Sequence, residues 1–259
     1  ADAVHSFSDL ATDVVVIVFA RISAKPRDDG HDYGHGKYET LATILISMAL
    51  GVVGVGILVN SIGAVRSVLD GGVLPRPGLV ALVAAVLSIA AKEILYRYTV
   101  REGRAIDSPS VVANAWHHRS DAFSSIATLL GIGAARAFGG KWVIMDPVAA
   151  IVVGALIVKI SIELVIPNLG DLLEKRLPAS EEHRILEMIS SISGIQDPHR
   201  LRARNLGTRI AVEMSIRLSP DMTVDASHLV TADIEELLRR EYGPETQVTV
   251  NVEPFRPIR

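Results

Sequence analysis

Long apolar stretches alternate with short polar loops over the first two thirds of the chain. The clearest stretch covers residues 41–65, where 25 consecutive residues carry no charge. At about 1.5 Å per residue, a helix of this length can cross a bilayer with some tilt. Four further stretches are interrupted by ionisable residues: 1–22, 78–98, 110–138 and 147–166. The loops between them contain Gly, Pro or Asp, which favour turns. The pattern predicts an α-helical transmembrane bundle with five helices present.

The pattern changes after residue 169 to short elements. Residues 179–192 and 223–243 place apolar side chains at helical spacing, whereas 199–207, 208–218 and 246–254 alternate as strands do, the first two around a turn at Gly207. The predicted order is αββαβ, a small α+β domain with two helices on one face of a three-stranded sheet. A domain of roughly 80 residues is near the lower limit of independent stability, so dimerisation would stabilise it. We therefore divide the chain into residues 1–169 and 170–259.

Charge supports this division and gives an orientation. Of the 55 Asp, Glu, Lys and Arg residues, 27 lie in the last 90 positions, although 49% of the whole chain is hydrophobic. Basic residues cluster in the loops 22–40 and 98–110, and since they favour the cytoplasm, these loops and the second domain are predicted to be cytoplasmic. Residue 1 then falls on the outer side. One earlier helix would return the N-terminus to the cytoplasm, so we expect a parent protein with six membrane helices.

Two histidine–aspartate pairs interrupt the apolar stretches. His5 and Asp9 are four residues apart in "HSFSD", and His117 and Asp121 repeat the spacing in "HHRSD". Residues four apart share a helix face, and ionisable groups at bilayer depth are costly enough to indicate function. Since the chain has no cysteine, a metal must be bound by His, Asp or Glu, and the two pairs together supply a tetrahedral set for Zn²⁺. Alternatively, each pair is a structural hydrogen-bonded couple, or His5 is simply hydrated near the membrane surface.

Several motifs together make the chain resemble the cation diffusion facilitator family over essentially its whole length. They are "ADAVHSFSDLATD", the loop "SAKPRDDGHDYGHGKYE", "ANAWHHRSDAFSS", the "DP" that opens the last membrane helix, "LLEKRLP" and the tail ending in "VNVEP". The resemblance implies a homodimeric divalent-metal/proton antiporter with six membrane helices, the first absent here, and a metallochaperone-like cytoplasmic domain. It also implies a multi-pass protein of the inner (plasma) membrane, surrounded by lipid, without an organic cofactor or a nucleic-acid partner.

The resemblance also implies which residues transport the metal. By position, the transport ligands are His5, Asp9, His117 and Asp121. This set resembles that of the zinc-transporting members, because manganese-type members favour carboxylates or amides at these places. Zn²⁺ is therefore the predicted substrate, with Cd²⁺, Co²⁺, Fe²⁺ or Mn²⁺ as alternatives.

Two features of the polar loop are implied by the same resemblance. Asp28, His31 and His35 match residues that hold a metal in the zinc members, and the neighbouring glycines would let a short loop wrap around an ion. The alternative is a hydrated polar turn. Lys37 matches a residue that forms an ionic interlock with an acid at the end of the last membrane helix, which is Glu174 here.

A third set of candidate ligands lies in the second domain and departs from the family pattern. His199 and His228 match metal-ligating positions, and Glu253 stands where an Asp would. Asn251 replaces a histidine, which weakens a two-metal cluster, although Glu213 could substitute from the neighbouring strand. The alternative is a set of scattered surface histidines on a dimerisation domain.

The predicted mechanism is alternating access around the intramembrane site. Metal binding needs neutral imidazoles and ionised carboxylates, so metal and protons compete for the same groups. A zinc-dependent membrane hydrolase would need an open coordination position and a general base. No HExxH motif occurs, and no enzyme activity is predicted. A membrane-bound metal sensor or scaffold, which binds metal without moving it, stays open as an alternative.

Overall fold

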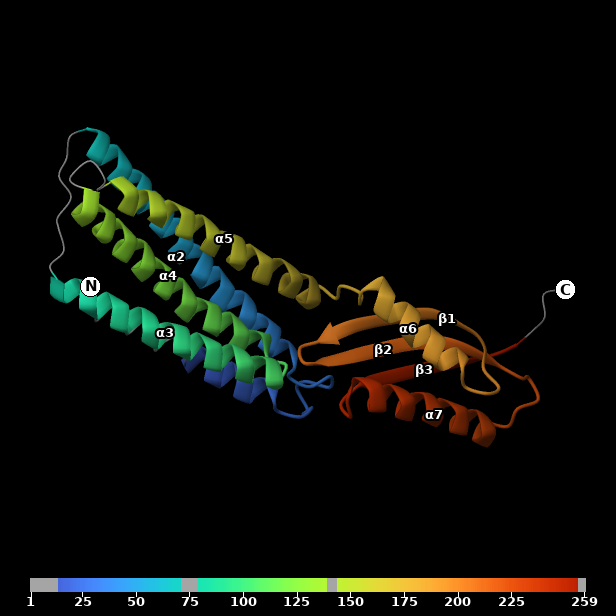
Figure 1. The fold of residues 1–259 in the computed structure, drawn as a ribbon. Helices are drawn as coiled ribbons and strands as arrows, with labels where there is room; N and C mark the ends of the chain where they lie inside the picture. The colour runs from blue at the N-terminus through green and yellow to red at the C-terminus, as the bar shows by residue number, and fades with distance from the viewer. Residues whose placement is uncertain (1–13, 71–78, 139–143, 256–259) are drawn as a thin grey trace. The chain divides into compact units, whose positions relative to one another are not determined.

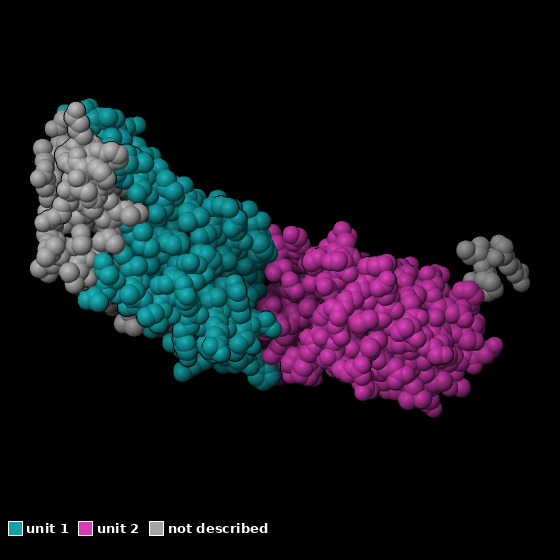
Figure 2. Space-filling model, in the orientation of Figure 1, with its two compact units in different colours: residues 1–26, 38–169 teal, residues 27–37, 170–259 magenta. Residues whose placement is uncertain are grey.

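A computed structural model describes residues 14–70, 79–138 and 144–255. The chain divides into two compact units (Figure 2): residues 1–26 with 38–169, and residues 27–37 with 170–259. The loop 27–37, which the sequence places in the membrane domain, thus groups with the second unit.

The first unit is helical (Figure 1). A helix over Val14–Ser23 is followed by α2 (Lys37–Leu69), α3 (Leu79–Ala105), α4 (Pro109–Phe138) and α5 (Met145–Leu172). The apolar stretches locate all of these helices, but α2, α3 and α5 run several residues further, because polar and charged residues stay helical beyond the apolar segment. Among the described helices, two are long and apolar enough to cross a membrane, namely Lys37–Leu69 and Pro147–Leu172.

Close packing of α2 against α5 depends on small residues. A Cβ on Gly154 would lie 2.9 Å from Cγ of Leu58 and 3.1 Å from the carbonyl oxygen of Gly54. Nearby, the hydroxyl of Ser161 donates a hydrogen bond of 2.7 Å to the carbonyl oxygen of Ser47. Small residues let two helix backbones approach closely and bond across their contact, as in membrane bundles. This contact therefore joins α2 and α5 into one pair.

The second unit contains α6 (Ala179–Ser190), β1 (Gln196–Leu206), β2 (Arg209–Leu218), α7 (Val224–Tyr242) and β3 (Gln247–Pro254). β2 is the central strand, antiparallel to β1 and parallel to β3 (Figure 1). The core forms between both helices and one face of this sheet, from Ile185, Ile189, Val212, Met214, Ile216, Leu218, Ile234 and Leu238. Glu213, Ser215 and Arg217 alternate with these core residues on β2 and lie on the opposite face. The predicted αββαβ order is confirmed.

The turn between β1 and β2 contacts the loop 27–37 through two glycines. A Cβ on Gly36 would overlap the carbonyl oxygen of Leu206, and one on Gly207, where φ is +71°, would overlap the carbonyl oxygen of Gly36. The side-chain amide of Gln247 also donates to the carbonyl oxygen of Tyr33 at 3.1 Å. The glycine at position 36 is thus required for packing against the β1–β2 turn.

Gly36→Ala is therefore expected to destabilise the second unit by about 1–3 kcal/mol, the usual cost of overpacking. The measurement is the thermal unfolding temperature, together with the rate of proteolysis within the loop. Gly63→Ala is the matched control, because a Cβ on Gly63 meets nothing within 4 Å. Equal unfolding temperatures and cleavage rates for Gly36→Ala and the wild type would contradict this account of the contact.

Candidate metal centres

Asp28, His31 and His35 converge within the loop 27–37. Their candidate ligand atoms all lie within 4.8 Å of one another. The two carboxylate oxygens of Asp28 divide between the histidines, with Oδ1 3.3 Å from Nδ1 of His31 and Oδ2 3.4 Å from Nε2 of His35. A short antiparallel bridge between the backbones of Asp28 and His31 closes the loop. The sequence-predicted loop residues are thus brought together.

The charge state of this group suits a divalent cation. Desolvation acts to raise the pKa of Asp28, but hydrogen bonds from the Gly30 N–H and the His31 side chain, with the nearby charge of His35, lower it below the usual 3.8. The carboxylate is therefore ionised at neutral pH. His35 is buried, whereas Asp28 and His31 are about half exposed. Two imidazole nitrogens and one carboxylate can hold a zinc-like ion with a fourth position open to water or another ligand.

Lys37 and Glu174 form the predicted ion pair. The other carboxylate oxygen of Glu174 lies 2.7 Å from Nε of Arg204 on β1, a partner that no local sequence pattern indicates. Glu174 has a φ of 63°, and Lys175 N–H donates to the carbonyl oxygen of Gly170 at 2.9 Å. This is the Schellman pattern at the end of α5, in which glycine usually occupies the left-handed position. Glu174 thus adopts a backbone conformation that is unfavourable for a non-glycine residue, and its carboxylate pairs with both Lys37 and Arg204.

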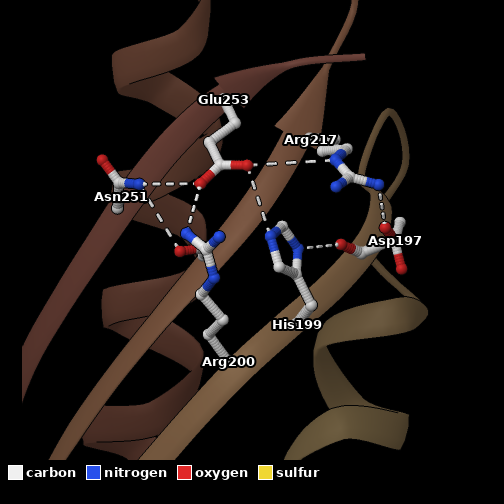
Figure 3. A network of polar contacts seen from close by, with 7 residues as sticks. Asp197, His199, Arg200, Arg217, Asn251 and Glu253 are labelled. Carbon is white, nitrogen blue, oxygen red and sulfur yellow. Dashed lines mark hydrogen bonds and ion pairs between the residues drawn. The ribbon is translucent and has the colours of Figure 1, made fainter. Parts of the chain in front are cut away.

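In the second domain, Glu253 on β3 contacts four side chains (Figure 3). Oε1 accepts from Arg200 at 3.0 Å and from the amide of Asn251 at 3.4 Å. Oε2 lies 3.3 Å from Nε2 of His199 and 3.9 Å from Nε of Arg217. Both oxygens are engaged, and two guanidinium groups lie beside them. A metal ion at Glu253 would have to displace these contacts and would be repelled by both arginines.

The other candidate ligands of this domain do not come together with Glu253 as a set of three in the described residues. The Nδ1–H of His199 donates to the carbonyl oxygen of Asp197 at 2.8 Å, which turns Nε2 towards Glu253. His228 is exposed on α7, and Glu213 pairs with Arg204 at 3.4 Å. Over the described ranges, the group of three that could hold an ion is the loop set. His199 and Glu253 are thus brought together as a pair.

The candidate transport site involves α4. His117 is buried, and Asp121 follows one helical turn later on the same face. The side chain of Asp121, and His5 and Asp9 entirely, lie outside the described residues. His118 is buried as well, and its Nε2 lies 3.4 Å from Nδ2 of Asn114. The sequence shows His118 only as the neighbour of His117, and its contact with Asn114 is visible only in the structure.

Comparison with known proteins defines the class. Residues 1–173 match the family model of the cation efflux transmembrane domain, and residues 177–255 match that of the cation efflux protein, cytoplasmic domain. The protein is therefore a membrane protein with a helical transmembrane domain and a cytoplasmic C-terminal domain. It belongs to the cation diffusion facilitator family, whose members are transporters and not enzymes. The predicted family, fold class and lack of an enzymatic role are confirmed.

Its relatives include proteins from bacteria and plants. The manganese efflux system protein MneP of Bacillus subtilis is 31% identical over 98% of this chain and 86% of its own length. Metal tolerance protein C1 of Arabidopsis thaliana is also 31% identical, over 98% of this chain and 56% of its own length. The metal-bound C-terminal domain of the CzcD transporter from Thermotoga maritima aligns with 32% of this chain and all of that chain, at 25% identity and a TM-score of 0.28.

Proposed function

We propose that this protein exports Zn²⁺ from the cytoplasm by proton-coupled alternating access. The cargo would bind to His5, Asp9, His117 and Asp121, and the observation that carries this assignment is His117, buried on α4 one turn before Asp121. Membership of a family of cation transporters supports the same role. Metal ions are the substrate here, and the site needs no organic cofactor.

Protons are proposed to drive the exchange. The metal needs neutral imidazoles and ionised carboxylates, so cytoplasmic loading releases protons from the site. When the site faces the other side, protonation of the same groups weakens metal binding and releases the ion. The metal ion and the protons each favour one conformation of the transporter, and they do so only because their affinity differs between the two conformations.

The predicted preference for Zn²⁺ rests on the ligands. Imidazole and carboxylate together suit Zn²⁺, whereas oxygen ligands suit Mn²⁺. The similarity to a manganese efflux protein makes Mn²⁺ the main competitor, and Cd²⁺, Co²⁺ and Fe²⁺ remain further candidates. A titration with competing metals on the full-length protein, followed by flux measurements with the same ions, tests the choice. Flux of Mn²⁺ that exceeds flux of Zn²⁺ at equal free concentrations would contradict it.

The remaining sites are proposed to regulate transport. The loop set of Asp28, His31 and His35 lies in the second unit with the cytoplasmic domain, so an ion there can bias the conformational equilibrium without passing through the membrane. A C-terminal site would use His199 and Glu253 with a further ligand such as His228 or Glu213, and metal binding there would require Arg200 and Arg217 to move away from Glu253. We also propose a homodimer held by the cytoplasmic domain, in the inner membrane.

The alternative function is that of a membrane-bound metal sensor or scaffold, which the loop set alone would serve. The test is metal flux into sealed vesicles that contain the purified protein. A sensor would bind Zn²⁺ and move none, whereas the proposed transporter would accumulate it.

A further inference from the structure

Glu39 is a buried carboxylate that none of the candidate metal centres uses. It lies in the first turn of α2, and only 2% of its surface is exposed. Oε1 accepts hydrogen bonds from the backbone N–H of Ser110 at 3.1 Å and from the Ser110 hydroxyl at 2.7 Å. It also accepts one from the hydroxyl of Ser108. All three donors belong to the segment where α4 begins.

This arrangement makes Glu39 a cap for α4, supplied by another helix. The first N–H groups of a helix have no partner within the helix, and Ser110 N–H is one of them. An anion is favoured at a helix N-terminus by the helix dipole, and hydrogen bonds to a charged acceptor are stronger than neutral ones. Ser108 reinforces the start of the helix, because its carbonyl oxygen accepts from Val112 N–H at 3.2 Å. One carboxylate therefore joins the first turns of α2 and α4.

The joined helix is the one that carries His117 and Asp121. Seven residues, or about 10 Å along the axis, separate Ser110 from His117, so movement of the first turn also moves the candidate ligand. The packing behind the link is tight. Thr43 is fully buried and donates to the carbonyl oxygen of Glu39 at 2.9 Å, and Ala113 on α4 packs in a buried cluster with Ile46 on α2.

We propose that Glu39 is a positioning residue for transport, and that its link to α4 keeps the cytoplasmic path to the transport site closed until the link breaks. The starts of α2 and α4 lie on the same side of the membrane as the end of α5, because successive helices cross in opposite directions. The cytoplasmic domain follows α5. The inference rests on the proposed function, since it needs the metal to bind on α4.

Labelling of a single cysteine tests the link without measuring transport. The chain has no cysteine, so Ala113→Cys in the full-length protein gives one thiol at a position that is 1% exposed. Glu39→Ala is expected to raise the rate at which a charged maleimide modifies this thiol at least fivefold. Glu39→Gln, which keeps an acceptor oxygen but loses the charge, should give an intermediate rate. Glu102→Ala, which removes an exposed carboxylate of α3, should leave the rate unchanged.

Ser110→Ala provides a second variant if Glu39→Ala does not fold, because it removes one donor and leaves the carboxylate in place. A rise of at least twofold in the labelling rate of Ser110→Ala supports the link. Labelling of the folded variants at the rate of the Ala113→Cys parent would overturn it.

Flux measurements separate positioning from a merely structural role. In Glu39→Ala, the maximal rate per folded protein and the half-saturating metal concentration should both fall at least fivefold. The reason is that a larger fraction of the protein is then open to the cytoplasm. This fraction binds cytoplasmic metal more readily, but it converts more slowly to the state that releases the metal on the other side. Wild-type values of both quantities would overturn the proposal. Should the wild-type protein move no metal, the proposed function fails, while the labelling rates still decide whether Glu39 closes this end of α4.

Discussion

Asp121→Ala is expected to abolish metal flux while leaving a folded protein. The substitution removes one of two carboxylates from the proposed four-ligand set, and His117, one turn away, cannot replace its charge. Loss of a residue that only supports a metal ligand typically costs about 10–100-fold in affinity or activity, so loss of the ligand should lower flux by at least roughly a hundredfold. The measurement is initial flux of Zn²⁺ into vesicles, normalised to the amount of folded protein.

The matched control for Asp121→Ala is Glu163→Ala. Glu163 lies on the membrane helix α5. Its side chain is well exposed, and Oε1 lies 3.5 Å from Nζ of Lys159, so its loss removes a charge without removing a proposed ligand. We expect it to retain most of the flux. Wild-type flux in Asp121→Ala would show that Asp121 is not a ligand of the transported ion.

The double variant His31→Ala/His35→Ala is expected to raise the metal concentration needed for half-maximal flux and to leave the maximal rate within about twofold. In the proposed regulatory role, an ion in the loop would bias the equilibrium between transport states, and such couplings typically amount to about 1–3 kcal/mol, or roughly 5–150-fold in affinity. The measurement is flux against free Zn²⁺ for the variant and the wild type.

His183→Ala is the control for the loop variant, because His183 is an exposed histidine of α6 that pairs with Glu187 at 3.1 Å. Its half-saturating concentration should equal that of the wild type. A complete loss of maximal rate in the loop variant would show that the loop lies on the transport path and does not only regulate it.

Local patterns in the sequence predict most of the elements. The uncharged stretch 41–65 locates α2, and alternation in 208–218 locates β2, because helix and strand periodicities are written directly into neighbouring residues. The family motifs also predict two features of the loop, the set of Asp28, His31 and His35 and the pair of Lys37 and Glu174, but not its contacts with Leu206 and Gln247.

Contacts between distant segments are harder to predict. Glu39 and Ser110 are 71 positions apart, and the sequence pattern places Glu39 in the polar loop 22–40, just before the apolar stretch 41–65. Arg204 alternates with other arginines on β1, but its place beside Glu174 depends on how β1 packs against the end of α5. Contacts of this kind form only when the helices and strands pack together, and no pattern among neighbouring residues predicts them.

Exchange of metal for protons is the central step of the proposed mechanism. The direct test uses sealed vesicles that contain the purified full-length protein and a pH-sensitive dye, with Zn²⁺ added on the side of the cytoplasmic domain. We expect Zn²⁺ entry to be accompanied by proton movement in the opposite direction, an imposed proton gradient to accelerate entry, and both signals to vanish in Asp121→Ala. Binding of Zn²⁺ with neither entry nor a pH change would contradict proton-coupled transport and would identify a sensor.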